Sequence, residues 1–269
     1  MRKILLLFIN PLLLIGSELI VDNKALSQYQ IDNYAFFDAF DYHGGFDGYI
    51  PNDPSDRIFL PETFPILGNA FTLEAWFYAR DVGGNKTIIG TESIGDGSDI
   101  DEPPMIILHK TNSIRYGFGT GSEEIISKVN NVRSPDTWHH VAYTFDGTDS
   151  KLYVDGIMVD SSRVAQGKTP VQKPLDVIGK KMRGKIDEVR VWSLARTQQE
   201  IESSMDDILN GNETGLVAYY PMDTNNEWKL IDRTSNNNHA TIKHAEIRQR
   251  YYSNSCPSPD GTFDCPYLT

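Results

Sequence analysis

Short apolar runs that recur about every ten residues constrain the fold of this chain more than any other feature. Between residues 46 and 192, segments rich in Ile, Val, Phe, Tyr and Trp are separated by Gly, Asp and Asn. The segment FTLEAWFYA (71–79) places Phe71, Leu73 and Phe77 on one face of a strand. This pattern is typical of an antiparallel β-sandwich, and the sequence predicts an all-β fold of two packed sheets.

Local motifs predict two turns and one helix. Asp155-Gly156 separates two apolar runs, which is a strong signal for a two-residue hairpin, and Asp146-Gly147 has the same chemistry. Thr197 and Glu200 form the sequence pattern of a capping box, with apolar residues following at helical spacing until Asn210-Gly211. We therefore expect one peripheral helix of about 12 residues after the last strand of the sandwich.

The N-terminus has the pattern of a secretory signal. Arg2 and Lys3 precede an apolar run from Ile4 to Ile15, which is too short for a membrane span of roughly 20 residues. Ala25-Leu26-Ser27 supplies small residues for cleavage before Gln28. We predict a signal peptide over residues 1–27 and a secreted, extracellular protein; an uncleaved short anchor is the alternative.

The two cysteines are consistent with export. Cys256 and Cys265 bracket a Pro-Asp-Gly turn in the tail that follows residue 245. A disulfide between them is expected in an oxidising compartment, and two free thiols are the alternative. A zinc site would need four ligands, and the tail offers no neighbouring pair of histidines.

Charge excludes some classes of partner. The chain carries 25 Lys and Arg against 37 Asp and Glu, a net charge of −12. Nucleic acids and anionic membranes require clustered basic residues, so neither is expected as a partner. The rest of the chain has no second long apolar run, and we predict no membrane span.

Four ordered motifs resemble the concanavalin A-like, laminin G-like jelly-roll family, which includes pentraxin-like domains. They are FDG with DRIFLP (46–61), FTLEAWFYA (71–79), DTWHHVAYTFDGTDSKLYVDGIMVD (136–160) and GKIDEVRVWSLARTQQEI (184–201). The resemblance covers roughly residues 46–242. It implies a two-sheet jelly-roll sandwich, frequent calcium, and binding of glycans or proteins rather than catalysis.

The order of one motif departs from the family. GLVAYYPMD and SNNNHATI, which resemble an opening element of family members, here follow the helix. Either residues 215–244 fold back as closing strands, or they begin a second domain; we expect closure, because an unpaired apolar strand invites aggregation. The predicted organisation is an N-terminal extension (28–45), the jelly-roll domain (46–245) and a polar tail (246–269).

An acidic loop is the first candidate for a metal site. Asp96, Asp99, Asp101 and Glu102 lie between two predicted strands, in a loop that also holds Gly and Ser. Ca²⁺ takes six to eight oxygen ligands, which such a loop can supply, although the spacing is not that of an EF-hand. A solvated acidic turn is the alternative.

Asp187 is the second candidate. Strict alternation would place it on the same face as Val189 and Val191, where a carboxylate must be paired, hydrogen-bonded or bound to a metal. The resemblance to concanavalin A-like glucanases implies structural calcium at this position, and Asp47, Asp38 or Asp41 could supply further oxygens. Hydrogen bonds to backbone amides are the alternative, and a β-bulge would reverse the face.

Catalysis is not expected. The related glucanases place paired carboxylates on one strand, whereas Glu74 has no second acid at position 72, 76 or 78. His139 and His140 lack a serine or cysteine partner set for a nucleophilic triad, and both cysteines lie far away in the tail, so we interpret the two histidines as structural.

The sequence thus predicts a non-catalytic binding or adhesion module for glycans or extracellular proteins. Exposed aromatic rings would provide the sugar platform, and most aromatics should lie in the core. The candidates are Trp76, Tyr78, Tyr116, Tyr153 and Trp228. A structural matrix or coat protein is the second hypothesis, and a divergent glycoside hydrolase is the third.

Overall fold

The computed structural model describes residues 32–38, 57–80, 84–91, 99–109, 112–224, 226–243 and 245–250. The chain forms two compact units, and nearly all the described residues belong to the unit Asn33–Arg248. The predicted signal peptide (1–27) and disulfide (Cys256 and Cys265) lie outside the described residues.

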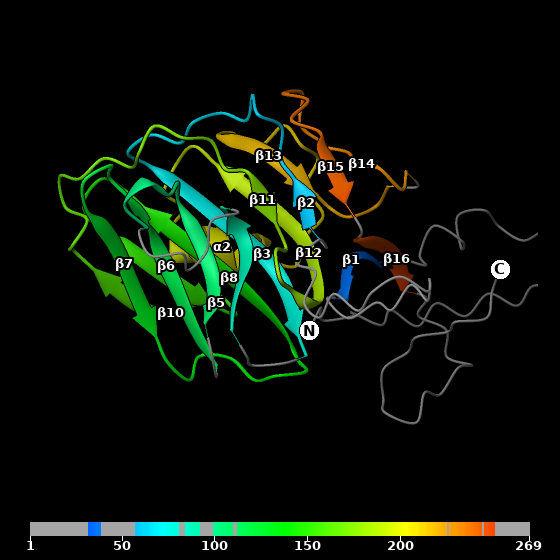
Figure 1. Cartoon of the computed structure of the whole chain (residues 1–269), viewed down its shortest axis with the longest axis horizontal. Coiled ribbons are helices and arrows are strands. Elements are labelled where there is room, and N and C mark those ends of the chain that lie inside the picture. Colours follow the sequence, from blue (N-terminus) through cyan, green and yellow to red (C-terminus); the bar gives the residue numbers. More distant parts are fainter. Residues whose placement is uncertain are drawn as a thin grey trace, which may run out of the picture. The chain divides into compact units, whose positions relative to one another are not determined.

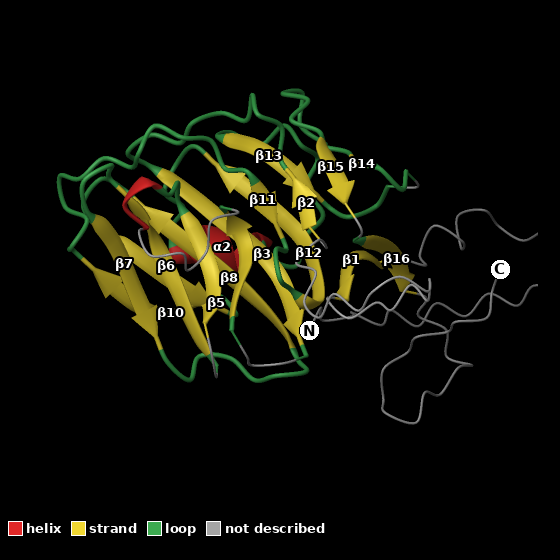
Figure 2. Ribbon diagram, viewed as in Figure 1, coloured by secondary structure: helices red, strands yellow, loops and turns green. Residues whose placement is uncertain are grey.

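Two antiparallel sheets, each with eight strands among the described residues, form a jelly-roll sandwich (Figures 1 and 2). Sheet A contains, in order, β10 (Ile157–Ser162), β9 (Ser150–Val154), β8 (Trp138–Phe145), β3 (Phe71–Ala79), β12 (Arg183–Trp192), β1 (Asp32–Asp38) and β16 (Glu246–Arg250), with β13 (Leu216–Tyr220) also paired to β12. Sheet B contains β14 (Lys229–Leu230), β15 (Ala240–Lys243), β2 (Arg57–Phe59), β11 (Val177–Ile178), β4 (Asn85–Gly90), β5 (Met105–His109), β6 (Ser113–Gly119) and β7 (Glu124–Val129).

The main core lies between the sheets. Phe71, Leu73 and Phe77 from β3 pack in one cluster with Ile89 and Tyr116 of sheet B. The alternation predicted for residues 71–79 is therefore confirmed. The opposite face of β3 is also buried, because other parts of the chain cover it.

Both predicted turns form. Asp155 and Gly156 have φ values of 52° and 79°, the geometry of a type I′ hairpin turn, and join β9 to β10. At the other turn, the Oδ1 atom of Asp146 accepts hydrogen bonds from the backbone N–H groups of Thr148 and Asp149. The side chain of Asp146 thus accepts hydrogen bonds from backbone N–H groups at the point where the chain reverses direction.

The predicted helix forms but is shorter than expected. In α2 (Gln198–Ser204), Thr197 and Glu200 make the reciprocal hydrogen bonds of a capping box. Arg190 donates hydrogen bonds to the carbonyl oxygens of Ser204 (2.9 Å) and Asp207 (2.5 Å). The guanidinium thus satisfies carbonyls at and just beyond the end of the helix, which lies well before Asn210. The described residues also contain one short 3₁₀ helix, η1 (Asp99–Asp101).

Residues 215–244 contribute strands to both sheets. β13 pairs antiparallel with β12, and β15 pairs antiparallel with β2. Between them, the buried carboxylate of Asp232 accepts hydrogen bonds from the backbone N–H groups of Tyr219, Thr234 and Asn238. These bonds fold the polar loop back onto the sandwich, so that the segment closes the fold.

Strands also occur beyond the boundaries predicted for the jelly-roll domain. β1 lies within the predicted N-terminal extension, and its residues Ala35–Asp38 pair with Ile186–Arg183 of β12. β16 follows residue 245 and extends the same sheet. The sequence motifs do not mark either strand, because both are short and contain polar residues.

The predicted face of Asp187 is wrong. The pairing of β12 with β3 shifts its register between Asp187 and Arg190, and Glu188 has a φ of 52°, which together mark a β-bulge. Asp187 lies opposite Trp76, whereas Val189 belongs to the core between the sheets. The bulge thus places the carboxylate on the outer side of sheet A.

Candidate functional site

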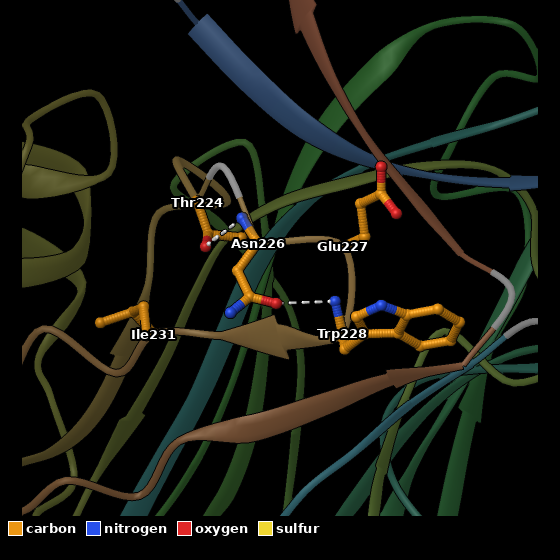
Figure 3. Close-up of a pocket in the computed structure, with 5 residues that line it drawn as sticks. All are labelled: Thr224, Asn226, Glu227, Trp228 and Ile231. Carbon is orange, nitrogen blue, oxygen red and sulfur yellow. Dashed lines mark hydrogen bonds between the residues drawn. The ribbon is translucent and has the colours of Figure 1, made fainter.

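A shallow surface pocket lies beside strand β14 at the edge of sheet B (Figure 3). Its lining residues all come from the connection between β13 and β14 and from the residue after β14: Thr224, Asn226, Glu227, Trp228 and Ile231. Since β14 pairs only with β15 among the described strands, this edge of the sheet remains open on its other side. The pocket is accessible to a ligand from solvent.

Side-chain hydrogen bonds to the backbone fix the shape of this loop. The Oδ1 atom of Asn226 accepts from the backbone N–H groups of Trp228 (2.9 Å) and Lys229 (3.0 Å). The Oγ1 atom of Thr224 accepts from the N–H of Asn226 and donates to the carbonyl oxygen of Lys229. Such Asx and Thr turns hold a loop without help from a core. They bond the backbone around Trp228 to two side chains of the same loop.

Trp228 is the most distinctive residue of the pocket, because 70% of its surface is exposed. Ile231, which is 36% exposed, adds a second apolar side chain. The indole of Trp228 therefore presents an apolar surface to solvent next to a second apolar side chain of the pocket. An aromatic ring of this kind can stack on the apolar face of a ligand.

The other aromatic candidates are not accessible in the same way. Trp76, Tyr116 and Tyr153 are buried, and Tyr78 is half-buried. The Nε1 atom of Trp76 donates a hydrogen bond to the carbonyl oxygen of Met205, just after α2. The expectation that most candidates are buried is confirmed, and Trp228 is the exception.

The predicted metal ligands are distributed between described and undescribed parts of the chain. Asp96 and Asp47 lie outside the described residues, and Asp99 begins η1. Asp101 is exposed, whereas Glu102 is buried and its Oε2 atom accepts a hydrogen bond of 2.5 Å from the hydroxyl of Thr91.

Asp176 is an acidic neighbour of Glu102 that the sequence patterns did not mark. It lies just before β11, and its Oδ1 atom has no hydrogen-bond partner among the described residues. Burial and the negative charge of Glu102 raise the pKa of Asp176 to about 6. The sequence signal that could have identified Asp176 was its position directly before a short apolar strand.

Asp187 has a backbone partner in the structure. Its Oδ1 atom accepts a hydrogen bond of 2.8 Å from the N–H of Glu188, within the bulge. Among the described residues, no three His, Cys, Asp or Glu side chains converge as ligands for one metal ion. The described carboxylates therefore do not form a complete calcium site by themselves.

A buried charged network lies on the outer side of sheet A. The Oε1 atom of Glu74, which is fully buried, accepts hydrogen bonds from the Nε1 of Trp192 (2.7 Å) and the Nη1 of Arg196 (3.0 Å). The Nε2 of His140 lies 3.6 Å from Glu74, and the Nη1 of Arg190 lies 4.0 Å from it. Enclosed in this way, Glu74 anchors the segment around α2 and cannot reach a ligand in solvent.

The two histidines have structural environments. The Nδ1 atom of His139 lies 2.8 Å from the Oδ2 of Asp155, and its Nε2 accepts from the N–H of Ser134. Burial lowers the pKa of His140 to about 4, although Glu74 acts in the opposite direction. His140 is therefore neutral at pH 7, and neither of its ring nitrogens has a hydrogen-bond partner among the described residues, whereas His139 links two turns.

Comparison with known proteins identifies the family. A model of the concanavalin A-like lectin/glucanases superfamily, in its laminin G-like class, matches residues 52–202, which is more than half of the chain. The chain belongs to this superfamily. The resemblance of its four sequence motifs is thus confirmed, and so is the jelly-roll architecture that the resemblance implied.

Two curated relatives share part of the sequence. Pappalysin-1 of Mus musculus is 30% identical over 159 residues, and pappalysin-1 of Homo sapiens is 28% identical over 179 residues. These alignments cover 51% and 55% of this chain but 10% of each relative. The chain thus spans about a tenth of the length of these proteins.

Solved structures show the same fold. A Bacteroides ovatus structure named as a "putative carbohydrate binding protein" aligns with a TM-score of 0.60 at 20% identity, covering 82% of this chain and 60% of that one. A heptameric SAP-like pentraxin from Limulus polyphemus aligns with a TM-score of 0.52 at 12% identity, covering 80% of this chain and 94% of its own. At these identities, the likeness concerns the fold alone.

Proposed function

We propose that this chain is an exported, non-catalytic binding module that holds a glycan in the Trp228 pocket. The observation that carries the proposal is the exposed indole of Trp228, held on a hydrogen-bonded loop that also presents the side chains of Asn226 and Glu227. Pyranose rings offer apolar C–H faces that stack on such rings, while their hydroxyls bond to amides and carboxylates. The name of the B. ovatus structure points to the same class of ligand.

A glycan array tests the proposal. The full chain should bind at least one group of related glycans, and Trp228→Ala should remove that binding. Ile157→Ala is the matched control, because Ile157 is also an exposed apolar residue (63%) but lies on β10, in the other sheet. Binding that survives Trp228→Ala, or no binding to any glycan, would count against the proposal.

Calcium remains a proposal for the acidic loop that contains Asp96, Asp99, Asp101 and Glu102. Its support is the oxygen-rich chemistry of the loop and the crowding of Glu102 against Asp176, which a cation would relieve. Melting the protein in millimolar Ca²⁺ and in chelator tests it. A ligand that binds the folded state raises the Tm, so equal Tm values would exclude a stabilising calcium site.

Export is supported by the predicted signal peptide over residues 1–27. The structure describes no helix that could cross a membrane. Expression of the full chain with a secretory host, followed by N-terminal sequencing, should give a mature chain that begins at Gln28. Retention of residues 1–27 on a membrane-bound product would instead indicate an uncleaved anchor.

Protein–protein packing is the second candidate function. Ile157 and Met158 are 63% and 47% exposed on β10, the edge strand of sheet A, and exposed apolar side chains on an edge can dock another chain. Sedimentation velocity over a range of concentrations tests it: self-association that Ile157→Lys abolishes would favour a matrix or coat role.

A further inference from the structure

The polar groups around Trp228 define which sugars the pocket can accept. Asn226 uses its Oδ1 atom to hold the backbone of the loop, so its Nδ2 group is the part left for a ligand. The structure gives this Nδ2 group and the exposed Glu227 carboxylate no partner among the described residues. Figure 3 shows both side chains on the same short loop as Trp228. The loop thus presents one amide donor and one carboxylate acceptor in addition to the indole.

Glu227 is also the one ionisable residue among the five that line the pocket. Among the described residues, no ion pair joins Glu227 to a cation, including the exposed Lys229 two positions along the chain. The five side chains that line the pocket therefore carry one negative charge.

We propose that the Trp228 pocket selects uncharged or amine-bearing pyranoses and rejects sugars that carry a carboxylate, with Glu227 as the discriminating residue. This inference rests on the proposed glycan-binding function. A carboxylate accepts hydrogen bonds from two neighbouring hydroxyls or from an ammonium group. A uronic or sialic acid would instead bring a second negative charge beside Glu227, and like charges held together at an interface are a source of specificity.

The test uses immobilised pyranosides in pairs that are identical except at C6, which is CH₂OH in one member and COO⁻ in the other. The full chain should bind the neutral member of at least one pair about tenfold more tightly than the acidic member at low salt. That ratio should fall as the salt concentration rises, because exposed charges are screened.

Variants separate this inference from the function on which it rests. Glu227→Gln removes the charge but keeps the shape, and it should bring the two affinities within about threefold of each other. Glu62→Gln, at an exposed glutamate in the turn after β2, is the control and should leave the ratio unchanged. Equal or tighter binding of the acidic member by the unmodified chain, or an unchanged ratio in Glu227→Gln, would overturn the inference. Absence of binding to both members of every pair, or binding that Trp228→Ala does not affect, would instead overturn the proposed function.

Discussion

At the scale of single residues, Glu74 shows how this fold tolerates a buried charge. Its side chain is fully buried on the outer side of sheet A, where an unpaired carboxylate would be strongly destabilising. Hydrogen bonds from Trp192 and Arg196 to its Oε1 atom and the nearby guanidinium of Arg190 compensate for part of the lost hydration, whereas its Oε2 atom has no hydrogen-bond partner among the described residues. The partners come from β12 and from the segment that leads into α2, so one carboxylate ties several parts of the chain together.

Glu74→Ala should therefore lower the free energy of unfolding by about 3–5 kcal/mol, because Arg190 and Arg196 would be left without this counter-charge in a buried site. Urea denaturation followed by circular dichroism measures this change. Glu62→Ala, which removes an exposed glutamate, should change stability by no more than about 0.5 kcal/mol. A loss below about 1 kcal/mol for Glu74→Ala would show that the network contributes little.

Asp176 should make stability depend on pH. Its folded pKa of about 6 lies above its ordinary value of 3.8, so the folded state holds the proton more tightly than the unfolded state does. The free energy of unfolding should fall as the pH rises from about 4 to about 6, by about 1–2 kcal/mol after allowance for solvent screening. Asp176→Asn should remove this part of the pH dependence. The same slope in both proteins, measured by denaturation at several pH values, would contradict the assignment.

At the scale of secondary-structure elements, α2 depends on its two ends. The capping box of Thr197 and Glu200 satisfies backbone groups at the start of the helix, and Arg190 binds carbonyl oxygens at and beyond its end. Because the helix is too short to be stable alone, these contacts and the burial of Ile201 hold it on the sheet.

Thr197→Ala removes the N-cap hydroxyl and should cost about 1 kcal/mol of unfolding free energy. Hydrogen exchange should show faster exchange at the amides of α2, while the amides of β3 are unaffected. Thr214→Ala, at an exposed threonine outside any cap, is the matched control. Equal exchange rates in the two variants would mean that the cap does not contribute to the helix.

Local sequence signals predicted the elements whose geometry depends on neighbouring residues. The Asp155-Gly156 turn and the Thr197 capping box belong to this class, since each involves contacts within a few residues. The bulge at Glu188 has no comparable signal, because an L-residue with a positive φ is stabilised there by tertiary contacts. The one extra residue of this bulge, the alternative that the sequence left open, reverses the predicted face of Asp187.

The residues of the candidate site also differ in how much of their role the sequence could predict. Trp228 could be named from sequence as one of several aromatic candidates, but its exposure depends on how β14 lies at the edge of sheet B. The partners of Glu74 could not be found from sequence, because they come from residues more than a hundred positions away. Long-range contacts of this kind leave no periodic pattern in the chain.

At the scale of the whole molecule, the sandwich is closed by segments from its two extremes. In sheet A, β1 and β13 pair with the same edge of β12. In sheet B, β15 pairs with β2. The chain between residues 57 and 204, which carries the family motifs, is therefore completed by strands on either side of it.

Deletion of residues 215–250 should prevent cooperative folding, because it removes the partners of β12 and β2 and opens two apolar edges. Thermal melting followed by circular dichroism should show no sharp transition for this truncation. Trp228→Ala, a change within the same segment that removes no strand pairing, should keep the Tm of the unmodified chain. A sharp transition in the truncated chain would show that the segment is dispensable for folding.

The proposed glycan-binding function depends most on the indole of Trp228 as the contact surface for the sugar. Its most direct test is the dissociation constant of an array-selected glycan, measured by titration calorimetry for the unmodified chain and for Trp228→Ala at matched Tm. Loss of a stacking aromatic should weaken binding at least about tenfold without a change in Tm. Dissociation constants within twofold of each other would place the glycan elsewhere on the molecule and contradict the proposed function.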